Sequence, residues 1–165
     1  MRGLFITFEG GDGSGKTTQI ELLTSWLEEQ KETVVVTREP GGTDLGNELR
    51  QLVMHRKGFI APRAEALMYA ADRSHHVQTV VRPALDRGEI VVQDRYLDSS
   101  IAYQGAGRVL DVDEIRNLSV WATEGLVPDL TILLDVSADV ARLRRLKASA
   151  AFDRLEAENE NFHNL

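Results

Sequence analysis

The sequence predicts a three-layer α/β domain in which helices cover both faces of a central parallel sheet. Four short runs of aliphatic and β-branched residues each have the length of one buried strand, at 4–8, 33–37, 90–92 and 130–134. Helical patterns separate these runs, as in the strand–helix–strand units that build a parallel sheet. The chain has 165 residues and is 42% hydrophobic, enough for one substantial core. We therefore expect a single domain over residues 1–165.

The first two helices are predicted from apolar spacing and from a capping residue. After the first strand and a glycine-rich loop, Ile20, Leu23 and Leu27 recur at helical spacing. The next helix is expected from residue 45 to about residue 53, behind a Pro-Gly-Gly-Thr turn in which Thr43 can serve as the N-cap. Both helices therefore follow directly on predicted strands.

Four further segments have helical patterns. Residues 63–87 carry apolar side chains at helical spacing and predict one long helix, with Pro83 as a kink or break. Shorter helices are expected at 112–122 and 138–147, and segment 153–165 also has a helical pattern. Because the chain stops inside that last pattern without a stop signal, we expect it to be truncated or to lack its tail.

A phosphate-binding loop lies between the first strand and the first helix. Residues 10–17 read GGDGSGKT, a complete G-x-x-x-x-G-K-[ST] motif. In such a loop the backbone N–H groups face phosphate oxygens, Lys16 reaches the outer phosphates and the Thr17 hydroxyl binds Mg²⁺. An ordinary glycine-rich turn is the alternative, but the strand–loop–helix context favours a nucleoside polyphosphate site. Its predicted residues are Gly10, Gly11, Asp12, Gly13, Ser14, Gly15, Lys16, Thr17 and Thr18.

A second charged cluster is expected beside this loop. Asp94 and Arg95 follow the third strand directly, at the carboxyl end of the sheet. Asp94 can hold Mg²⁺ through water, and Arg95 can neutralise a phosphoryl group with its planar fork. The alternative is a strand end closed by a salt bridge.

Other arginines are expected near this cluster, and a second phosphorylated substrate would explain their number. Arg38, Arg50 and Arg73 lie on segments that should end on the same side of the sheet as Arg95. For Arg50, a solvated charge on a helix surface explains the residue equally well. The basic segment 142–154 can close over a polyphosphate as a lid, or simply carry positive charge near a helix C-terminus.

These segments together resemble the thymidylate kinase family, which phosphorylates dTMP with ATP. The matching segments are 8–18, 37–43 with R-E-P-G-G-T, 65–73, and 94–105 with D-R-Y-x-x-S-S-x-A-Y-Q-G. The R-E-P-G-G-T motif and the D-R-Y-x-x-S-S-x-A-Y-Q-G motif together are far more specific than the phosphate loop. The resemblance implies a P-loop kinase fold, ATP as phosphate donor with Mg²⁺, and a homodimer paired through helices.

The resemblance also implies roles for individual residues in the acceptor site. Tyr69 would stack on thymine, while Arg73, Ser100 and Gln104 would face the polar edge of the base. Tyr103 would crowd the sugar where a 2′-hydroxyl would project.

Other implied roles concern the sugar, the phosphate and the loop that carries them. Asp12 would lie near the sugar 3′-hydroxyl or the metal. Arg38 and Arg95 would hold the monophosphate, and the Glu39–Pro40 bond matches a cis bond of the family. The predicted acceptor residues are therefore Asp12, Arg38, Glu39, Pro40, Arg50, Tyr69, Arg73, Arg95, Ser100, Tyr103 and Gln104.

The lid distinguishes two styles within the family. One style places an arginine in the phosphate loop, where this chain has Gly13. The other supplies arginine from the lid, and Arg154 is our first choice within segment 142–154. The predicted catalytic residues are Lys16, Asp94, Arg95 and Arg154, with Thr17 and Asp94 for the metal. The resemblance also implies a continuation, in relatives, through a fifth strand and a closing helix, with the loop that cups adenine in that part.

Composition restricts the partners and the location. Nineteen basic and 26 acidic residues give a net charge of −7, which argues against general binding to nucleic acid or anionic membranes. There is no cysteine, and no apolar run approaches the ~20 residues of a membrane span, so we expect a soluble cytoplasmic protein. The four histidines form no metal-ligand pattern, and we interpret them as surface or packing residues.

Three alternative functions stay open at this stage. A kinase for another nucleoside or nucleoside monophosphate would share the phosphate loop and the Asp94–Arg95 pair. A nucleotide-dependent switch or partitioning ATPase is less consistent with the sequence, which has neither an N-K-x-D nor a D-x-x-G motif. The chain could also be an inactive fragment that retains only the binding half.

Overall fold

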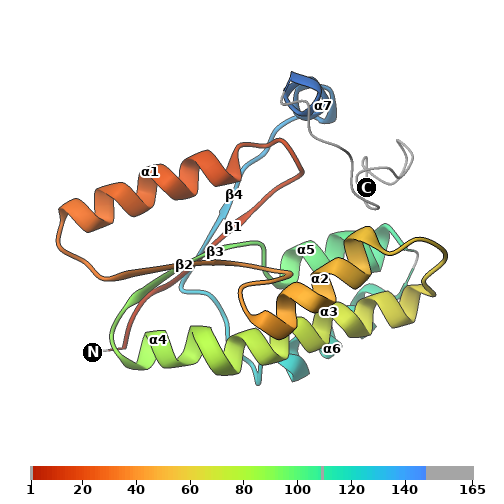
Figure 1. The fold of residues 1–165 in the computed structure, drawn as a ribbon, viewed down its shortest axis with the longest axis horizontal. Coiled ribbons are helices and arrows are strands. Elements are labelled where there is room, and N and C mark those ends of the chain that lie inside the picture. The colour runs from red at the N-terminus through yellow and green to blue at the C-terminus, as the bar shows by residue number, and fades with distance from the viewer. Residues whose placement is uncertain (1, 109, 148–165) are drawn as a thin grey trace.

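The computed structural model describes residues 2–108 and 110–147, and within them it confirms the parallel sheet. Four strands pair in the order β2-β3-β1-β4, all parallel (Figure 1). Their bounds are β1 Phe5–Glu9, β2 Val34–Arg38, β3 Ile90–Asp94 and β4 Leu130–Leu133. Each bound lies within two residues of its prediction. Because every strand runs the same way, all four carboxyl ends meet at one edge of the sheet.

The helices complete a three-layer arrangement. Figure 1 shows α1 on one side of the sheet and the long run from α3 to α4 on the other. The helices are α1 Lys16–Glu29, α2 Asp44–His55, α3 Pro62–His76, α4 Arg82–Asp86, α5 Leu97–Ser100, α6 Val112–Ala122 and α7 Ala138–Lys147. Within the described residues, no helix is long and apolar enough to cross a lipid bilayer.

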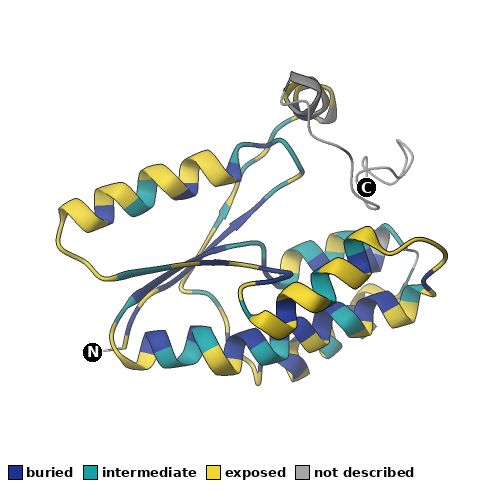
Figure 2. Cartoon of the chain, viewed as in Figure 1, coloured by how far each residue is buried: buried dark blue, intermediate teal, exposed yellow. Residues whose placement is uncertain are grey.

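The hydrophobic core around the sheet has two parts, one on each face, and a smaller third cluster joins Val53 of α2 to Tyr69 of α3. Alternate residues of a strand point to opposite faces, and β1 accordingly divides its side chains: Phe5 packs toward α4, whereas Ile6 and Phe8 pack toward α1. The buried positions of the strands therefore form the dark centre of Figure 2, between the exposed outer surfaces of the helices. The α4-side cluster contains Phe5, Val77, Val81, Ala84, Leu85, Val91, Tyr96 and Leu126. The α1-side cluster contains Ile6, Phe8, Ile20, Leu27, Ile90 and Val92.

The long helix predicted over residues 63–87 forms, but Pro83 does not break it. Instead, α3 continues through a π-helical segment, Val77–Val81, directly into α4. Proline has no N–H group to donate to the preceding turn, and its ring crowds the carbonyl there. The wider π turn just before Pro83 accommodates both features, so the helix is distorted but not broken there.

Helix α2 begins where the capping signal placed it. The Thr43 hydroxyl accepts a hydrogen bond from the Gly46 N–H at 2.8 Å. This cap fixes the start of α2 immediately after the turn that follows β2. The turn thus stands at the carboxyl end of the sheet, beside the phosphate-binding loop.

Candidate active site

The phosphate-binding loop connects β1 to the N-terminus of α1. Gly10 adopts φ 139°, and a Cβ at this position would lie 2.7 Å from the carbonyl oxygen of Leu134, so only glycine fits. The Lys16 ammonium donates to the carbonyl oxygens of Gly10 and Gly11 at 2.9 and 3.0 Å. Burial and the nearby Arg95 lower the pKa of Lys16. The loop and helix start form a cradle of backbone N–H groups with a cation held over it.

An open hollow extends from the phosphate loop toward β4 and α7. Its lining comprises Ser14, Gly15, Thr18, Gln19, Leu133, Leu134, Asp135, Val136 and Arg144. Arg144 of α7 donates to the Ser14 carbonyl oxygen at 3.1 Å, which ties the helix to the loop. A nucleoside whose phosphates lay in the cradle would therefore extend into this hollow.

Thr17 and Asp94 provide oxygen ligands that suit a hard cation. Thr17 is exposed in the first turn of α1, and Asp94 ends β3 next to β1, paired with Phe8. Asp94 Oδ1 is buried and has no hydrogen-bond partner among the described residues. Oxygen-only donors with few protein ligands fit Mg²⁺, which keeps several waters. No group of three or more His, Asp or Glu side chains in the described part of the chain forms a self-contained metal cage.

Arg95 joins the phosphate loop to the segment after β3. Its Nη2 lies 2.5 Å from Asp12 Oδ1, and its Nη1 donates to the Ser99 hydroxyl at 3.0 Å. The guanidinium carbon also lies 5.2 Å from the centroid of the Tyr103 ring. Burial opposes the charged form, but the Asp12 carboxylate and other neighbours outweigh it and raise the pKa of Arg95. A permanent cation therefore stands beside the loop.

A second cavity is bordered by Arg95 and by Asp12 of the phosphate loop. Nine of the eleven predicted acceptor residues border it: Asp12, Glu39, Pro40, Tyr69, Arg73, Arg95, Ser100, Tyr103 and Gln104. Arg38 and Arg50 do not border it. Arg38 is exposed at the end of β2, and Arg50 of α2 donates to the Pro40 carbonyl oxygen at 2.9 Å. The Glu39–Pro40 bond is cis, as the resemblance implied.

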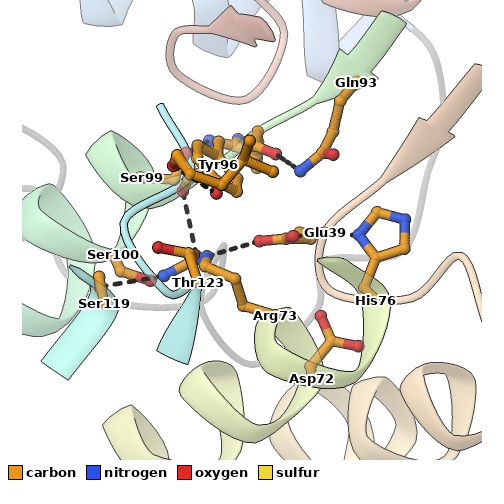
Figure 3. A network of polar contacts seen from close by, with 12 residues as sticks. Glu39, Asp72, Arg73, His76, Gln93, Tyr96, Ser99, Ser100, Ser119 and Thr123 are labelled. Carbon is orange, nitrogen blue, oxygen red and sulfur yellow. Dashed lines mark hydrogen bonds and ion pairs between the residues drawn. The ribbon is translucent and has the colours of Figure 1, made fainter. Parts of the chain in front are cut away.

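Arg73 is the centre of a buried polar network at the base of this cavity (Figure 3). Its Nε donates to Glu39 at 2.6 Å, and its Nη1 donates to the Ser119 hydroxyl at 3.1 Å. Its Nη2 donates to the Tyr96 carbonyl and the Ser100 hydroxyl at 3.1 and 3.0 Å. Only 2% of Arg73 is exposed, so these bonds fix the guanidinium plane.

One of the groups that hold Glu39 in place was not predicted from the sequence. His76, interpreted as a surface or packing residue, is fully buried; its Nδ1 lies 3.0 Å from Glu39 Oε1 and its Nε2 lies 2.6 Å from the Thr37 hydroxyl. Burial raises the pKa of Glu39, but Arg73 and His76 outweigh it and hold that pKa below its ordinary value. No local sequence signal shows these contacts, because they join residues 34 to 39 positions apart.

Two more buried carboxylates were missed. Glu9, at the end of β1, accepts from the Tyr96 N–H at 2.7 Å and from the Ser99 hydroxyl at 2.6 Å. Burial raises its pKa. Asp72 accepts from the Gly41 N–H at 3.1 Å, and burial, with the nearby Glu39, raises its pKa to about 7. Both residues lie within matching segments, Glu9 in 8–18 and Asp72 in 65–73, but neither was assigned a role.

Part of the predicted lid lies outside the described residues. Arg154 and positions 148–154 belong to that part. Of the basic residues in segment 142–154, Arg144 has a described side chain, and it contacts the phosphate loop as given above. The assignment of a lid arginine therefore stays a prediction.

A phosphate loop facing a second buried cavity across a fixed arginine defines a phosphotransferase of the P-loop nucleotide-kinase class. The comparisons agree: the thymidylate kinase family model matches residues 8–165, and the chain belongs to the thymidylate kinase family. Thymidylate kinase of Clavibacter sepedonicus is 69% identical over 99% of this chain and 77% of its own length. That of Leifsonia xyli subsp. xyli is 68% identical over 98% and 77%. The crystal structure of thymidylate kinase from Ehrlichia chaffeensis is 40% identical, with a TM-score of 0.78, and covers 87% of this chain and 82% of that one.

Proposed function

We propose that this protein transfers the γ-phosphoryl group of Mg·ATP to dTMP, giving dTDP and ADP. The observation that carries the proposal is the composition of the second cavity. The phosphate loop contributes Asp12 to its wall and the segment after β3 contributes Arg95. The two anion sites therefore share a wall, as direct transfer between two nucleotides requires.

The reaction needs positioning and charge neutralisation more than a base. An oxygen of the dTMP 5′-phosphate attacks the γ-phosphorus, and the bond from that phosphorus to the β–γ bridging oxygen breaks. The attacking oxygen is already anionic, so no strong base is needed. Lys16 would leave the carbonyls of Gly10 and Gly11 to meet the γ-phosphate, and Arg95 would exchange Asp12 for the transferring group.

Thr17 and Asp94 would hold the Mg²⁺ that accompanies ATP. Bound there, the metal would supply positive charge that offsets the negative charge of the phosphates. Thr17 offers an exposed hydroxyl, and Asp94 offers a carboxylate oxygen without a hydrogen-bond partner in the described structure. A further cation from segment 142–154, with Arg154 as first choice, would complete the neutralisation when the lid closes.

The donor nucleoside would occupy the hollow between the phosphate loop and α7. Arg144 borders this hollow and already contacts the loop through Ser14. A guanidinium can lie flat against a purine ring, which suits adenine. This placement supports ATP as donor, with phosphates on the loop and the base toward α7.

The acceptor base would lie between Tyr69 and the polar groups of the second cavity. Tyr69 supplies an aromatic face on α3, and Arg73, Ser100 and Gln104 supply hydrogen-bonding groups. Tyr103, held near Asp12 and Arg95, would crowd a ribose 2′-hydroxyl. The site would therefore favour a deoxyribonucleotide with a pyrimidine base.

Phosphate transfer to a panel of nucleoside monophosphates tests the proposal. We expect turnover of dTMP with kcat/KM at least about 100-fold above that of dCMP, UMP and dGMP, because a mismatched base leaves buried polar groups unpaired. Preference for another acceptor would establish a different nucleotide kinase. ATP hydrolysis that needs no acceptor would point to a switch or partitioning ATPase.

We further infer a homodimer that acts in the cytoplasm. The family resemblance implies pairing through helices, and α3 and α6 both expose apolar side chains on their outer surfaces, including Leu67 and Trp121. A second copy of the chain is the partner that such a face fits, since closed twofold pairing is the commonest symmetry of soluble oligomers.

A further inference from the structure

One buried carboxylate next to the acceptor cavity has no part in the mechanism given above. Glu65 of α3 is fully buried, and it lies four residues before Tyr69 and eight before Arg73. This spacing places the three side chains on one face of the helix. Glu65 itself does not border the cavity, so any effect on the acceptor must pass through a neighbour.

That neighbour is Gln104, whose amide borders the cavity. Gln104 Nε2 donates to Glu65 Oε1 at 3.1 Å. Among the described residues, no side chain or backbone N–H donates to Gln104 Oε1. One N–H of the NH₂ group is held by Glu65, and the carbonyl oxygen is the acceptor that this amide offers to a ligand.

Arg108 fixes the polarity of the Glu65 carboxylate. Its Nε lies 3.2 Å from Glu65 Oε1 and its Nη2 lies 3.3 Å from Glu65 Oε2. A guanidinium can only donate, so both carboxylate oxygens act as acceptors toward it. A carboxylate that only accepts can pair with the NH₂ group of Gln104 and not with its carbonyl oxygen. The order Arg108, Glu65, Gln104 thus sets which end of the amide faces the cavity.

Arg73 presents the opposite polarity to the same cavity. Four of its N–H donors are bonded to Glu39, Ser119, Tyr96 and Ser100. A guanidinium has five N–H groups, which leaves one donor on Nη1. Arg73 and Gln104 both border the cavity, so an unbonded Arg73 N–H and the unbonded Gln104 carbonyl oxygen lie at its wall.

We propose that Glu65 is a positioning residue for base selection: by orienting Gln104, it makes the site accept pyrimidines with an N3–H donor and reject cytosine. Thymine and uracil offer a carbonyl oxygen at C4 beside the N3–H, which complements the Arg73 donor and the Gln104 acceptor. Cytosine offers an amino group and an unprotonated N3, the reverse pattern, and leaves both protein groups unpaired. This inference rests on the proposed dTMP kinase function and names the group that sets its specificity.

The test compares kcat/KM for dTMP and dCMP in the full chain and in Glu65→Gln. The substituted amide has the same shape but only one acceptor oxygen, and Arg108 competes for it. Its NH₂ group then faces Gln104 and favours the flipped amide, which presents a donor to the base. We expect the dTMP-to-dCMP ratio to fall about 10- to 100-fold, mainly through KM, with KM for ATP unchanged.

Two further variants make the result decisive. Glu114→Gln removes a carboxylate that is also paired with an arginine, Arg63 at 2.9 Å, but on the exposed side of α6, and it should leave the ratio unchanged. The double variant Glu65→Gln with Gln104→Glu keeps one carboxylate and one amide in contact. The carboxylate then stands at position 104, where it can only accept a hydrogen bond from the base. This exchange should restore the preference for dTMP.

The outcomes separate the inference from the proposed function. If the wild-type chain does not phosphorylate dTMP, the proposed function fails and the inference fails with it. If the wild type prefers dTMP but a folded Glu65→Gln keeps that preference within about twofold, Glu65 does not set specificity. Should Glu65→Gln be insoluble, the exchanged pair decides, and its failure to prefer dTMP overturns the inference.

Discussion

Arg95 stands in a left-handed backbone conformation, with φ 66°. A residue with a Cβ pays roughly 1 kcal/mol for this conformation, and such strain persists where the surroundings hold the residue for a purpose. Here the Arg95 N–H donates to the Phe8 carbonyl oxygen at 2.9 Å. The chain turns sharply after β3, and the guanidinium is directed back to Asp12 in the phosphate loop.

Removing the Arg95 side chain should lower catalysis without loss of ATP binding. We expect Arg95→Ala to reduce kcat by about 10²–10³-fold, the typical effect of deleting one group that stabilises transition-state charge. Arg95→Gly should lose the same activity but be more stable than Arg95→Ala, because glycine accepts the left-handed backbone. Steady-state kinetics, ATP titration and thermal unfolding measure these effects. Near-normal turnover by either variant would remove Arg95 from the mechanism.

Asp72 should make stability depend on pH. Its pKa is raised to about 7 by burial and by Glu39, above its ordinary value of 3.8. The folded state therefore binds a proton that the unfolded state has released, and stability contributed by this group falls as pH rises from about 4 to about 7. The loss is complete above that window. The Asp72→Asn variant cannot ionise and should lack this component.

Denaturant unfolding of both chains between pH 4.5 and 8 measures the effect. We expect the unfolding free energy of the wild type to fall relative to Asp72→Asn by a few kcal/mol over this window, at about 1.4 kcal/mol per pKa unit. Parallel curves for the two proteins would show that Asp72 does not carry the pH dependence. The Gly41 N–H keeps an acceptor oxygen in the variant, so the turn after β2 should remain formed.

At the scale of elements, two helices have equivalent caps, but only α2 follows directly on the turn after β2. Thr43 caps α2 beside the acceptor cavity, and Asp111 caps α6, accepting from the Glu114 N–H at 2.9 Å. Loss of either cap leaves an N–H group at the helix start without its partner. The two caps therefore allow helix stability to be separated from placement of the turn after β2.

We expect Thr43→Ala and Asp111→Ala to destabilise the fold by similar amounts, about 1 kcal/mol each. Only Thr43→Ala should also raise KM for dTMP, because α2 holds Arg50 against the Pro40 carbonyl. Thr43→Ser should restore both properties. Equal KM values in the two alanine variants would show that the cap contributes stability alone.

Most of the elements were predictable because their signals are local, although the short helix α5 was not predicted. Strand bounds follow short apolar runs, and α6 and α7 begin and end where the patterns indicated. The two π-helical segments, Val77–Val81 and Ile101–Ala106, were not predictable. A π turn adds one residue to a helical turn, and a single-sequence pattern does not reveal where packing requires that residue.

The site was predictable only in part, for the same reason. The phosphate loop and most of the acceptor residues stand in contiguous motifs, and nine of those residues do border one cavity. The groups that orient them, His76, Asp72 and Glu65, act across 31 to 39 positions of sequence. Their partners become known only when the helix α3 is packed against the sheet edge and the segment after β3.

At the scale of the whole molecule, both sides of the sheet expose large apolar side chains, and on the α3 and α6 side they lie beside a hollow. On the α3 and α6 side, Trp121 is 77% exposed and Leu67 is 58% exposed, beside an open hollow between the two helices. On the opposite side, α1 exposes Leu22 at 60% and Trp26 at 56%. Large aromatic side chains near a hollow are typical anchors of protein interfaces.

Introducing a negative charge on each side should therefore have different effects on assembly. If two copies pair through α3 and α6, Trp121→Glu places a carboxylate in the twofold interface, against apolar surface and near the same carboxylate of the second copy. We therefore expect the dissociation constant of the dimer to rise at least about 100-fold. Trp26→Glu is the matched control on α1 and should leave the mass unchanged. Sedimentation velocity over a range of protein concentrations measures both. A monomeric wild type, or a dimer unaffected by Trp121→Glu, would exclude this face, whereas loss of the dimer in Trp26→Glu would place the interface on α1.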